Sequence, residues 1–222
     1  MVRFTRHGLW EMIIGTLALV LIGVGLYLLN PWLAWLVVPV WLWLLAFFRD
    51  PERLLPEGKA TWVSPADGLV SDITQIDHDP LLGGPAVRVG IFLSVFNVHV
   101  NRSPCDGKVL KTIYKEGKFI NALKHNEASS DNESNTIVIG DETGRPTAVV
   151  KQIVGLIARR IISTTPEGTI VQRGQRIGMI KFGSRTELVI PTWLSPEIRV
   201  KVGQKVCGAA DIIAVVTYPA HE

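Results

Sequence analysis

The sequence predicts a mostly β soluble domain, a sandwich or barrel with lipoyl-like hairpins, preceded by an N-terminal α-helical membrane hairpin. Three observations predict this fold class. Hydrophobic residues make up 47% of the chain, and their excess lies before Arg49 in two long uncharged runs. After about Pro56, short β-branched runs alternate with Gly, Pro and Asp turns. Two pairs of short motifs recur in this second part. We therefore predict a membrane anchor over residues 1–53 and a β domain over residues 54–222.

The N-terminal part contains two apolar runs, Met12–Leu29 and Trp32–Phe48, which are joined by Asn30-Pro31. Asn-Pro is a turn signal, and proline disfavours helix in the residue before it. Each run would form a helix of roughly 26 Å, just short of a hydrocarbon core of about 30 Å. The pattern predicts a helical hairpin with a kink at Pro39 in its second helix.

Positive charges flank this hairpin. Arg3 and Arg6 precede the first run, Arg49 and Arg53 follow the second, and the connecting turn carries none. Because cytoplasmic segments carry the excess of Lys and Arg, both ends should face the cytoplasm, with the soluble domain on the cytoplasmic face of the inner membrane. A secretory signal peptide is disfavoured because no small-residue cleavage site follows the first run. A hairpin buried in one leaflet is the stronger alternative because both runs are short.

Charge and cysteine content narrow the function classes. A net charge of +3 does not indicate the strongly basic face that nucleic-acid binding favours. Two cysteines, Cys105 and Cys207, do not make a disulfide framework, and we expect both to be reduced in a cytosolic compartment. No metal site is predicted.

A series of β-branched stretches predicts the strands of the β domain. They are Ala86–Leu93, Thr136–Gly140, Thr147–Gln152, Gly155–Ile162, Arg176–Phe182, Glu187–Pro191, Ile198–Val202 and Asp211–Thr217. A helix is predicted near Phe119–Lys124, and the polar stretch Asn126–Asn135 is predicted to be a loop.

Two internal repeats lie in the β domain. Ser64–Val70 and Ser103–Val109 share the pattern Ser-Pro-x-Asp-Gly, and Val171–Ile177 and Val200–Val206 share Val-x-x-Gly-Gln. The second pattern resembles the hairpins of lipoyl and biotinyl carrier domains, in which glycine permits a positive φ at the turn. We interpret the glycines as repeated turn chemistry.

A Gly-Ser pair in Phe182–Arg185 lies between two β-rich stretches. Gly-Ser is most often only a turn pair. Chemically, the Ser184 hydroxyl is adjacent to the carbonyl of Gly183, and glycine lacks the Cβ that would hinder a strained peptide and a tetrahedral intermediate. Ser184 can therefore attack the Gly183 carbonyl if a base removes its proton.

Candidates for the base and for an orienting acid lie elsewhere in the chain. His99 has a pKa range suited to a general base, although a histidine among alternating apolar residues is more often structural. Asp67 is typical of an Asx turn, but a carboxylate can also orient an imidazole and stabilise its charged form. Four arginines could hold a phosphate or carboxylate, although each is expected to be solvated: Arg102, Arg159, Arg160 and Arg185.

Taken together, these segments resemble phosphatidylserine decarboxylases, and best the short form of that family. The resemblance covers nearly the whole chain, and its segments agree with the family in order and spacing. They are Phe47–Arg53, Pro65–Gly68, Asn97–Pro104, Asn132-Glu133 and Phe182–Ser184.

The resemblance implies a membrane-bound, self-cleaving proenzyme. Ser184 would attack the Gly183 carbonyl, β-elimination would leave a carboxylate on Gly183 and a dehydroalanine at 184, and loss of ammonia would leave a covalent pyruvoyl group. The products would be a large chain, 1–183, and a small chain, 184–222, that stay together as a heterodimer. Asp67, His99 and Ser184 match the family's processing triad in kind.

The resemblance also implies the reaction. The pyruvoyl group derived from Ser184 would form a Schiff base with the amine of phosphatidylserine in the membrane and act as an electron sink when CO₂ leaves, giving phosphatidylethanolamine. His99 is the candidate acid that protonates the remaining carbon. Long-form members have two histidines three residues apart here, whereas this chain has Arg102 in the second position. His99 would then serve both processing and decarboxylation, or another residue such as His125 would take one role.

Two other functions are compatible with parts of the sequence. A pyruvoyl decarboxylase of another amine-bearing, soluble substrate is disfavoured by the membrane hairpin. A membrane-anchored lipoyl-like adaptor or carrier is favoured by the Val-x-x-Gly-Gln hairpins, but neither hairpin presents the Met-Lys-Met-like tip of a biotinyl domain. A carrier would stay one chain on a denaturing gel, whereas the decarboxylase would become two. A homo-oligomer is compatible with each of these functions.

Overall fold

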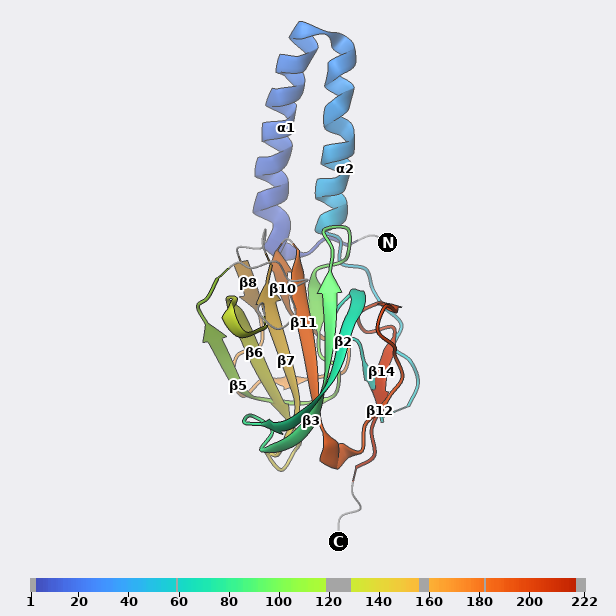
Figure 1. Ribbon diagram of the computed structural model, residues 1–222. Coiled ribbons are helices and arrows are strands. Elements are labelled where there is room, and N and C mark those ends of the chain that lie inside the picture. Colours follow the sequence, from blue (N-terminus) through green and yellow to red (C-terminus); the bar gives the residue numbers. More distant parts are fainter. Residues whose placement is uncertain (1–2, 59, 119–128, 156–159, 182, 219–222) are drawn as a thin grey trace. The chain divides into compact units, whose positions relative to one another are not determined.

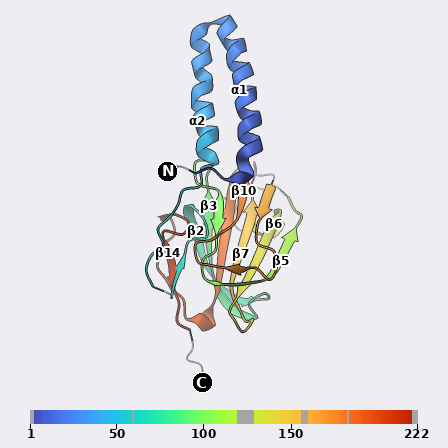
Figure 2. The same ribbon diagram turned by 180° about the vertical axis from the view of Figure 1, so that it is seen from behind.

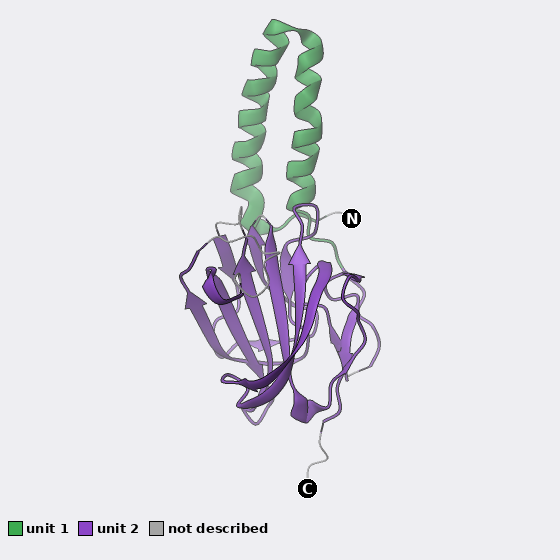
Figure 3. Cartoon of the chain, viewed as in Figure 1, with its two compact units in different colours: residues 1–52 green, residues 53–222 purple. Residues whose placement is uncertain are grey.

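The computed structural model describes residues 3–58, 60–118, 129–155, 160–181 and 183–218. The chain divides into two compact units, residues 1–52 and residues 53–222 (Figure 3). The first is helical and the second is built from β-strands, so the predicted fold class is confirmed. The predicted helix near Phe119–Lys124 lies outside the described residues.

The first unit is a helical hairpin. It consists of η1 (Arg6–Gly8), α1 (Leu9–Leu29), η2 (Pro31–Leu36) and α2 (Val37–Phe47). Asn30 is extended between the two arms, and its side chain accepts a hydrogen bond from the Trp32 amide, as its turn propensity predicts. The two ends of the unit pair with each other, because the Thr5 amide donates to the Phe48 carbonyl at 2.9 Å.

The second arm of the hairpin differs from the prediction. Its first turns form a 3₁₀-helix, and Pro39 is the third residue of α2, where its missing N–H removes no intrahelical bond. Pro39 thus lies near the 3₁₀-to-α junction rather than inside a long α-helix. In the described part of the chain, one helix, Arg6–Leu29, is long and apolar enough to cross a membrane, with a mean hydropathy of 2.5. The apolar segment Pro31–Phe47 is shorter.

The second unit contains three antiparallel sheets (Figures 1 and 2). Its strands are β1 (Thr61–Val63), β2 (Gly68–Asp79), β3 (Gly84–Leu93), β4 (Val100–Arg102), β5 (Gly107–Lys115), β6 (Ser134–Gly140), β7 (Pro146–Val154), β8 (Arg160–Ser163), β9 (Ile170–Val171), β10 (Arg176–Lys181), β11 (Ser184–Pro191), β12 (Glu197–Ile198), β13 (Lys205–Val206) and β14 (Ile212–Val215), with η3 at Thr192–Leu194. The largest sheet has the order β13-β2-β3-β11-β7-β6-β5-β9, and the smaller ones are β1-β14-β12 and β4-β10-β8.

The large sheet curls around the main hydrophobic core (Figures 1 and 2). Strand β11 is central, pairs with β3 and β7, and has all eight residues buried. Its residues alternate between two faces, so Leu188 and Ile190 enter the main core while Val189 joins a smaller cluster on the outer face. The two faces of β11 therefore meet different surroundings, and Ser184 and Arg185 at its start point to opposite faces.

The two copies of the Val-x-x-Gly-Gln repeat lie at the two edges of the large sheet. Strand β13, at the end of the Val200–Val206 segment, pairs with β2. Strand β9, which ends at the first residue of the Val171–Ile177 segment, pairs with β5. Their glycines, Gly174 and Gly203, have φ of 77° and 87°, as the repeated turn pattern predicts. Repeated turn chemistry therefore explains both glycines.

Several strand predictions need correction. Ser134 and Asn135, predicted in a loop, begin β6, where both are buried. The stretch predicted over Ile198–Val202 contributes only its first residue, to β12. Strand β8 contains only the last part of Gly155–Ile162, while Gly155 lies outside any strand. The long strands β2 and β5 were not predicted, because half-buried residues and charges interrupt their apolar pattern.

Candidate active site

Ser184 is the first residue of the central strand β11. It pairs in register with Leu93 of β3 on one side and Val154 of β7 on the other. Its side chain is fully buried, and no described residue hydrogen-bonds to its Oγ. Buried hydroxyl groups almost always have a partner, so this one is a candidate for a reacting group rather than a structural one.

Gly183 immediately precedes this serine and has a φ of 49°, in the left-handed region. An added Cβ would meet no atom of the described residues within 4 Å, so glycine is favoured here by the backbone conformation rather than by lack of space. A residue with a side chain costs about 1–2 kcal/mol in that conformation. The left-handed φ of Gly183 therefore gives the physical reason for a glycine at this position.

His99 is fully buried and immediately precedes β4. Its Nδ1 lies 3.0 Å from the carbonyl oxygen of Asn97. A carbonyl oxygen only accepts, so Nδ1 carries the proton, and in the neutral ring the lone pair lies on Nε2. The carbonyl of His99 accepts a hydrogen bond from Ile180 of β10 at 3.2 Å, which places His99 beside the strand end that leads into the Gly183–Ser184 turn.

A chain of buried amide side chains joins the strand after His99 to β11. Asn101 Nδ2 donates to Thr186 Oγ1, Gln152 Nε2 donates to Asn101 Oδ1, and Asn135 Nδ2 donates to Gln152 Oε1, each at 2.9 Å. Thr186 is two residues after Ser184, so their side chains share one face of β11. The polar chain therefore holds β4 against the face of β11 that carries Ser184.

Asp67 lies in the loop between β1 and β2 and is 8% exposed. Its Oδ1 accepts from the Gly208 amide and its Oδ2 from Arg53, both at 2.7 Å. Asp106, the equivalent residue of the repeat, is exposed and accepts from the Arg173 amide at 2.8 Å. The two aspartates thus share a local turn but differ in burial.

The loop that carries Asp67 is tied to the strand that follows His99. The Arg102 amide donates to the Pro65 carbonyl at 2.9 Å. The structure therefore connects the segments of all three predicted site residues: β10 and β4 bring His99 toward the Gly183–Ser184 segment, and β4 in turn binds the Asp67 loop.

The expectation that the arginines are solvated is wrong for two of them. Arg185 is fully buried, and Arg102 is 6% exposed and donates to the Gly174 carbonyl at 3.2 Å. Arg160 is exposed, as expected. Arg159, like His125, lies outside the described residues.

Cys105 and Cys207 are both free thiols, and burial, with a smaller contribution from the nearby Asp106 charge, raises the pKa of Cys105 far above its usual value. Among the residues that the structure describes, no three His, Cys, Asp or Glu side chains group as a metal site.

Sequence reasoning missed Asn101, Gln152 and Thr186. A signal was present in Asn97–Arg102, where polar and apolar residues alternate and place His99 and Asn101 on one face. Nothing local in the sequence indicates that Thr186 and Gln152 come from distant strands to meet them.

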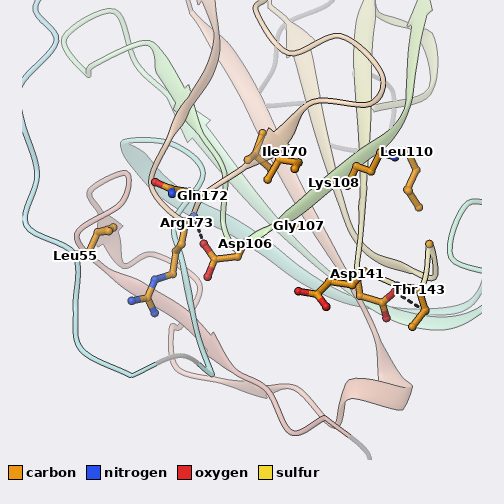
Figure 4. A pocket seen from close by; sticks show the side chains of 13 residues that line it. Leu55, Asp106, Gly107, Lys108, Leu110, Asp141, Thr143, Ile170, Gln172 and Arg173 are labelled. Carbon is orange, nitrogen blue, oxygen red and sulfur yellow. Dashed lines mark hydrogen bonds between the residues drawn. The ribbon is translucent and has the colours of Figure 1, made fainter.

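A pocket of about 1080 Å³ lies elsewhere in the β unit (Figure 4). Its lining includes Asp106, Lys108, Ile170 and Arg173, together with the β6–β7 turn at 141–144. The 141–144 turn precedes the first residue of β7, whereas Ser184 is in register with Val154, the last residue of β7. The pocket and Ser184 therefore lie at opposite ends of this strand. The acidic oxygens of Asp106 and Asp141 already accept backbone hydrogen bonds, which gives them a structural role.

Comparison with known proteins shows similarity to a single enzyme family. Residues 41–214 match the family model for phosphatidylserine decarboxylase. The chain is 43% identical over 208 residues to a phosphatidylserine decarboxylase proenzyme of Carboxydothermus hydrogenoformans, with 94% of each chain covered. It is 45% identical over 219 residues to the proenzyme of Rhodopirellula baltica, covering 95% of this chain and 87% of the relative. It is also 45% identical over 208 residues to that of Granulibacter bethesdensis, covering 92% and 82%. The chain therefore belongs to the phosphatidylserine decarboxylase family.

Proposed function

We propose that this chain is a self-cleaving proenzyme that decarboxylates phosphatidylserine to phosphatidylethanolamine and CO₂ with a pyruvoyl group formed from Ser184. Family membership supports the reaction and the proenzyme state. The observation that carries the assignment to Ser184 is its buried hydroxyl, which no described residue hydrogen-bonds and which directly follows a left-handed glycine. The fold loses no described hydrogen bond when this oxygen leaves.

In the proposed processing, Ser184 Oγ attacks the carbonyl carbon of Gly183, and the peptide C–N bond breaks as the nitrogen gains a proton. The result is an ester and a free amine at 184. A base then removes the Cα proton of residue 184, and the Cβ–Oγ bond breaks, which leaves the Gly183 carboxylate and a dehydroalanine. Water replaces the amine nitrogen, ammonia leaves, and a ketone remains at the start of the small chain.

His99 is the proposed base, because its lone pair lies on the buried Nε2 while Nδ1 donates to the Asn97 carbonyl. Asp67, which is buried, is the proposed carboxylate that favours the charged imidazole. The pyruvoyl carbonyl supplies the electron sink for the electron pair released when CO₂ leaves. His99 would then donate the proton to the substrate carbon from the same buried position.

The burial of residue 184 supports this proposal. Its side-chain face is the buried inner face of β11, and both neighbouring strands pair with it. A buried, water-poor position strengthens electrostatic interactions and limits side reactions of a ketone. The Val-x-x-Gly-Gln segments are turns next to the edge strands β9 and β13, which pair with β5 and β2, so they do not require a carrier function.

The apolar first unit is consistent with membrane association, which would keep the lipid substrate within the bilayer. We propose that both ends of the chain are cytoplasmic, because arginines flank the hairpin on both sides. Reporter fusions at position 2 and after Glu222 test this orientation. A periplasmic signal from the C-terminal fusion would defeat it.

Variants of Ser184 test the central assignment. Ser184→Ala should fold and reach the membrane but remain one chain without decarboxylase activity, because alanine can neither attack Gly183 nor eliminate. Ser184→Cys and Ser184→Thr keep a nucleophile, and of the two only Cys leads to an unsubstituted pyruvoyl group. Ser103→Ala is the matched control, because Ser103 is equally buried but its hydroxyl already donates to the Cys105 carbonyl.

Intact mass and a denaturing gel measure the cleavage. The wild type should give the fragments 1–183 and 184–222, and the smaller one should resist Edman sequencing because its first residue lacks an amine. The enzyme should be active without added pyridoxal phosphate, and phenylhydrazine, which reacts with carbonyl groups, should abolish that activity. An active, uncleaved wild type, or a Ser184→Ala variant that still makes phosphatidylethanolamine, would overturn the proposal.

A further inference from the structure

A group of mostly charged side chains lies on the outer face of the large sheet around Arg185, the second residue after the proposed cleavage point. Arg185 is fully buried there, and its Nε donates to Glu187 Oε1 at 2.9 Å. Its Nη2 pairs with Asp72 Oδ1 at 2.6 Å, and its Nη1 donates to Ser71 Oγ at 2.5 Å. We call Ser71, Asp72, Arg88, Arg185 and Glu187 the Arg185 cluster.

Glycine at position 90 makes this cluster possible. Gly90 of β3 is in register with Asp72 of β2 on one side and with Glu187 of β11 on the other. An added Cβ at Gly90 would overlap the Arg185 guanidinium. The guanidinium therefore lies across β3, between carboxylates from the strands on either side. Its planar fork suits such a position better than an ammonium group would.

Arg88 within the cluster and Lys151 beside it add further charges, so the charged members depend on one another. Arg88 lies 3.6 Å from Asp72 and 4.0 Å from Glu187. Lys151 is in register with Glu187, and burial lowers the pKa of Lys151 although the Glu187 charge opposes that shift. Loss of one partner would leave the other charges buried without full compensation.

The proposed cleavage cuts the chain between these partners. Arg185 and Glu187 belong to 184–222, whereas Ser71, Asp72 and Arg88 belong to 1–183. Before cleavage the start of β11 is held by its peptide bond to Gly183. After cleavage it is a chain end, and chain ends fray unless other contacts hold them.

We propose that Arg185 is a positioning residue that keeps the new end of the small chain in register after cleavage. Successive residues of a strand point to opposite faces, so Arg185 held on the outer face keeps residue 184 on the inner face, where the polar chain from β4 lies. A slip of one residue would turn the reacting group away from that face. This inference rests on the proposed cleavage between 183 and 184.

The experiment compares Arg185→Gln and Arg185→Lys with the control Arg173→Gln, in full-length protein in detergent. Arg173 also makes several hydrogen bonds, to Thr61 and Pro56, but all of these groups belong to 1–183. Three quantities are measured: the cleaved fraction by intact mass, kcat and KM per phenylhydrazine-reactive centre, and amide hydrogen exchange of residues 185–189. Exchange is measured both in cleaved protein and in the uncleaved Ser184→Ala background.

Losing charge-assisted hydrogen bonds at a chain end should reduce kcat per reactive centre by about tenfold or more in Arg185→Gln. KM should change little, Arg185→Lys should be intermediate, and Arg173→Gln should resemble the wild type. Amide exchange of 185–189 should accelerate in cleaved Arg185→Gln much more than in the uncleaved background. Equal acceleration in both backgrounds, or an unchanged kcat per centre, would overturn the positioning role.

Asp72→Asn is the second variant, because Asp72 is at the rim of the cluster with 18% of its side chain exposed. If Arg185→Gln does not yield folded protein, Asp72→Asn should show the same pattern of lowered kcat and faster exchange in cleaved protein only. A wild-type kcat in folded, cleaved Asp72→Asn would refute the inference. A wild type that is never cleaved would instead refute the proposed function, so the two failures are distinguishable.

Discussion

Replacing Thr186 by valine tests whether the buried polar chain positions the groups that process the precursor. Valine keeps the shape of threonine but removes the Oγ1 that accepts from Asn101 Nδ2 at 2.9 Å. Both side chains are fully buried, so the Asn101 donor is left without its acceptor. Leaving one buried polar group unsatisfied costs about 1–3 kcal/mol.

The magnitude follows from where this energy acts. The Asn101–Thr186 hydrogen bond joins β4 to β11, so its loss weakens the contact that holds the His99 segment against the Ser184 face. About 1.4 kcal/mol, which lies in the lower half of that range, corresponds to a factor of about ten in an equilibrium or rate. We expect Thr186→Val to slow cleavage of the folded precursor by about tenfold. Thr186→Ser, which keeps the hydroxyl, should cleave at nearly the wild-type rate.

The assay follows the precursor on a denaturing gel after a pulse of synthesis into detergent micelles, and protease resistance reports the folded fraction. Thr147→Val is the matched control, because Thr147 is 2% exposed and donates to the Ile139 carbonyl at 3.2 Å near the other end of β7. It should lose similar stability but cleave normally once folded. If both valine variants cleave at the same rate per folded molecule, the polar chain only stabilises the fold and the positioning argument fails.

Three other predictions follow from burial and charge. Asp67→Asn should slow processing by orders of magnitude, as loss of the orienting carboxylate does in a triad. Asp106→Asn, at the exposed equivalent position, should have only a mild effect. If a denaturing gel shows the reverse order, the orienting role belongs to Asp106 and not to Asp67. A maleimide should label Cys207 in native protein and Cys105 only after unfolding, because burial raises the pKa of Cys105 and blocks access; labelling of both at equal rates would contradict this. Burial alone would raise the pKa of Asp72, but the neighbouring guanidinium groups and hydrogen bonds lower it overall. Its stabilising contribution is therefore present above about pH 4 and lost as the pH falls further, so the Tm difference between wild type and Asp72→Asn should shrink only below about pH 4.

The helical hairpin and the two Val-x-x-Gly-Gln turns could be predicted because their signals are local. A long uncharged run needs no partner to be recognised, and Asn30-Pro31 ends it through its own backbone preferences. Likewise, glycine at 174 and 203 permits a positive φ regardless of what packs nearby. The strands β2 and β5 were missed because their exposed and half-buried positions carry polar residues, so their pairing and not their composition defines them.

The candidate site could be predicted only in part. Ser184 and Gly183 are neighbours in sequence, so their chemistry is visible there, and the resemblance to a family directed attention to His99 and Asp67. The environment of Arg185 could not be read in this way, because its carboxylate partner Asp72 is on β2 and the space for its guanidinium comes from Gly90 on β3. Charged side chains are usually exposed to solvent, so the burial of Arg185 becomes visible only in the tertiary structure.

The strand order explains how a chain cut at Ser184 can remain one structure. The segment 184–222 contains β11, β12, β13 and β14. Of these, β11 lies between β3 and β7, β13 pairs with β2, and β14 pairs with β1, so every one of these pairings is with a strand of 1–183. Separation of the two chains would break all of them and expose both faces of the central strand. We therefore expect the cleaved chains to stay associated without a covalent link and to separate only under denaturing conditions. Co-purification of 184–222 with an affinity tag at the N-terminus of 1–183 measures this, and recovery of the tagged chain alone from native protein would refute it.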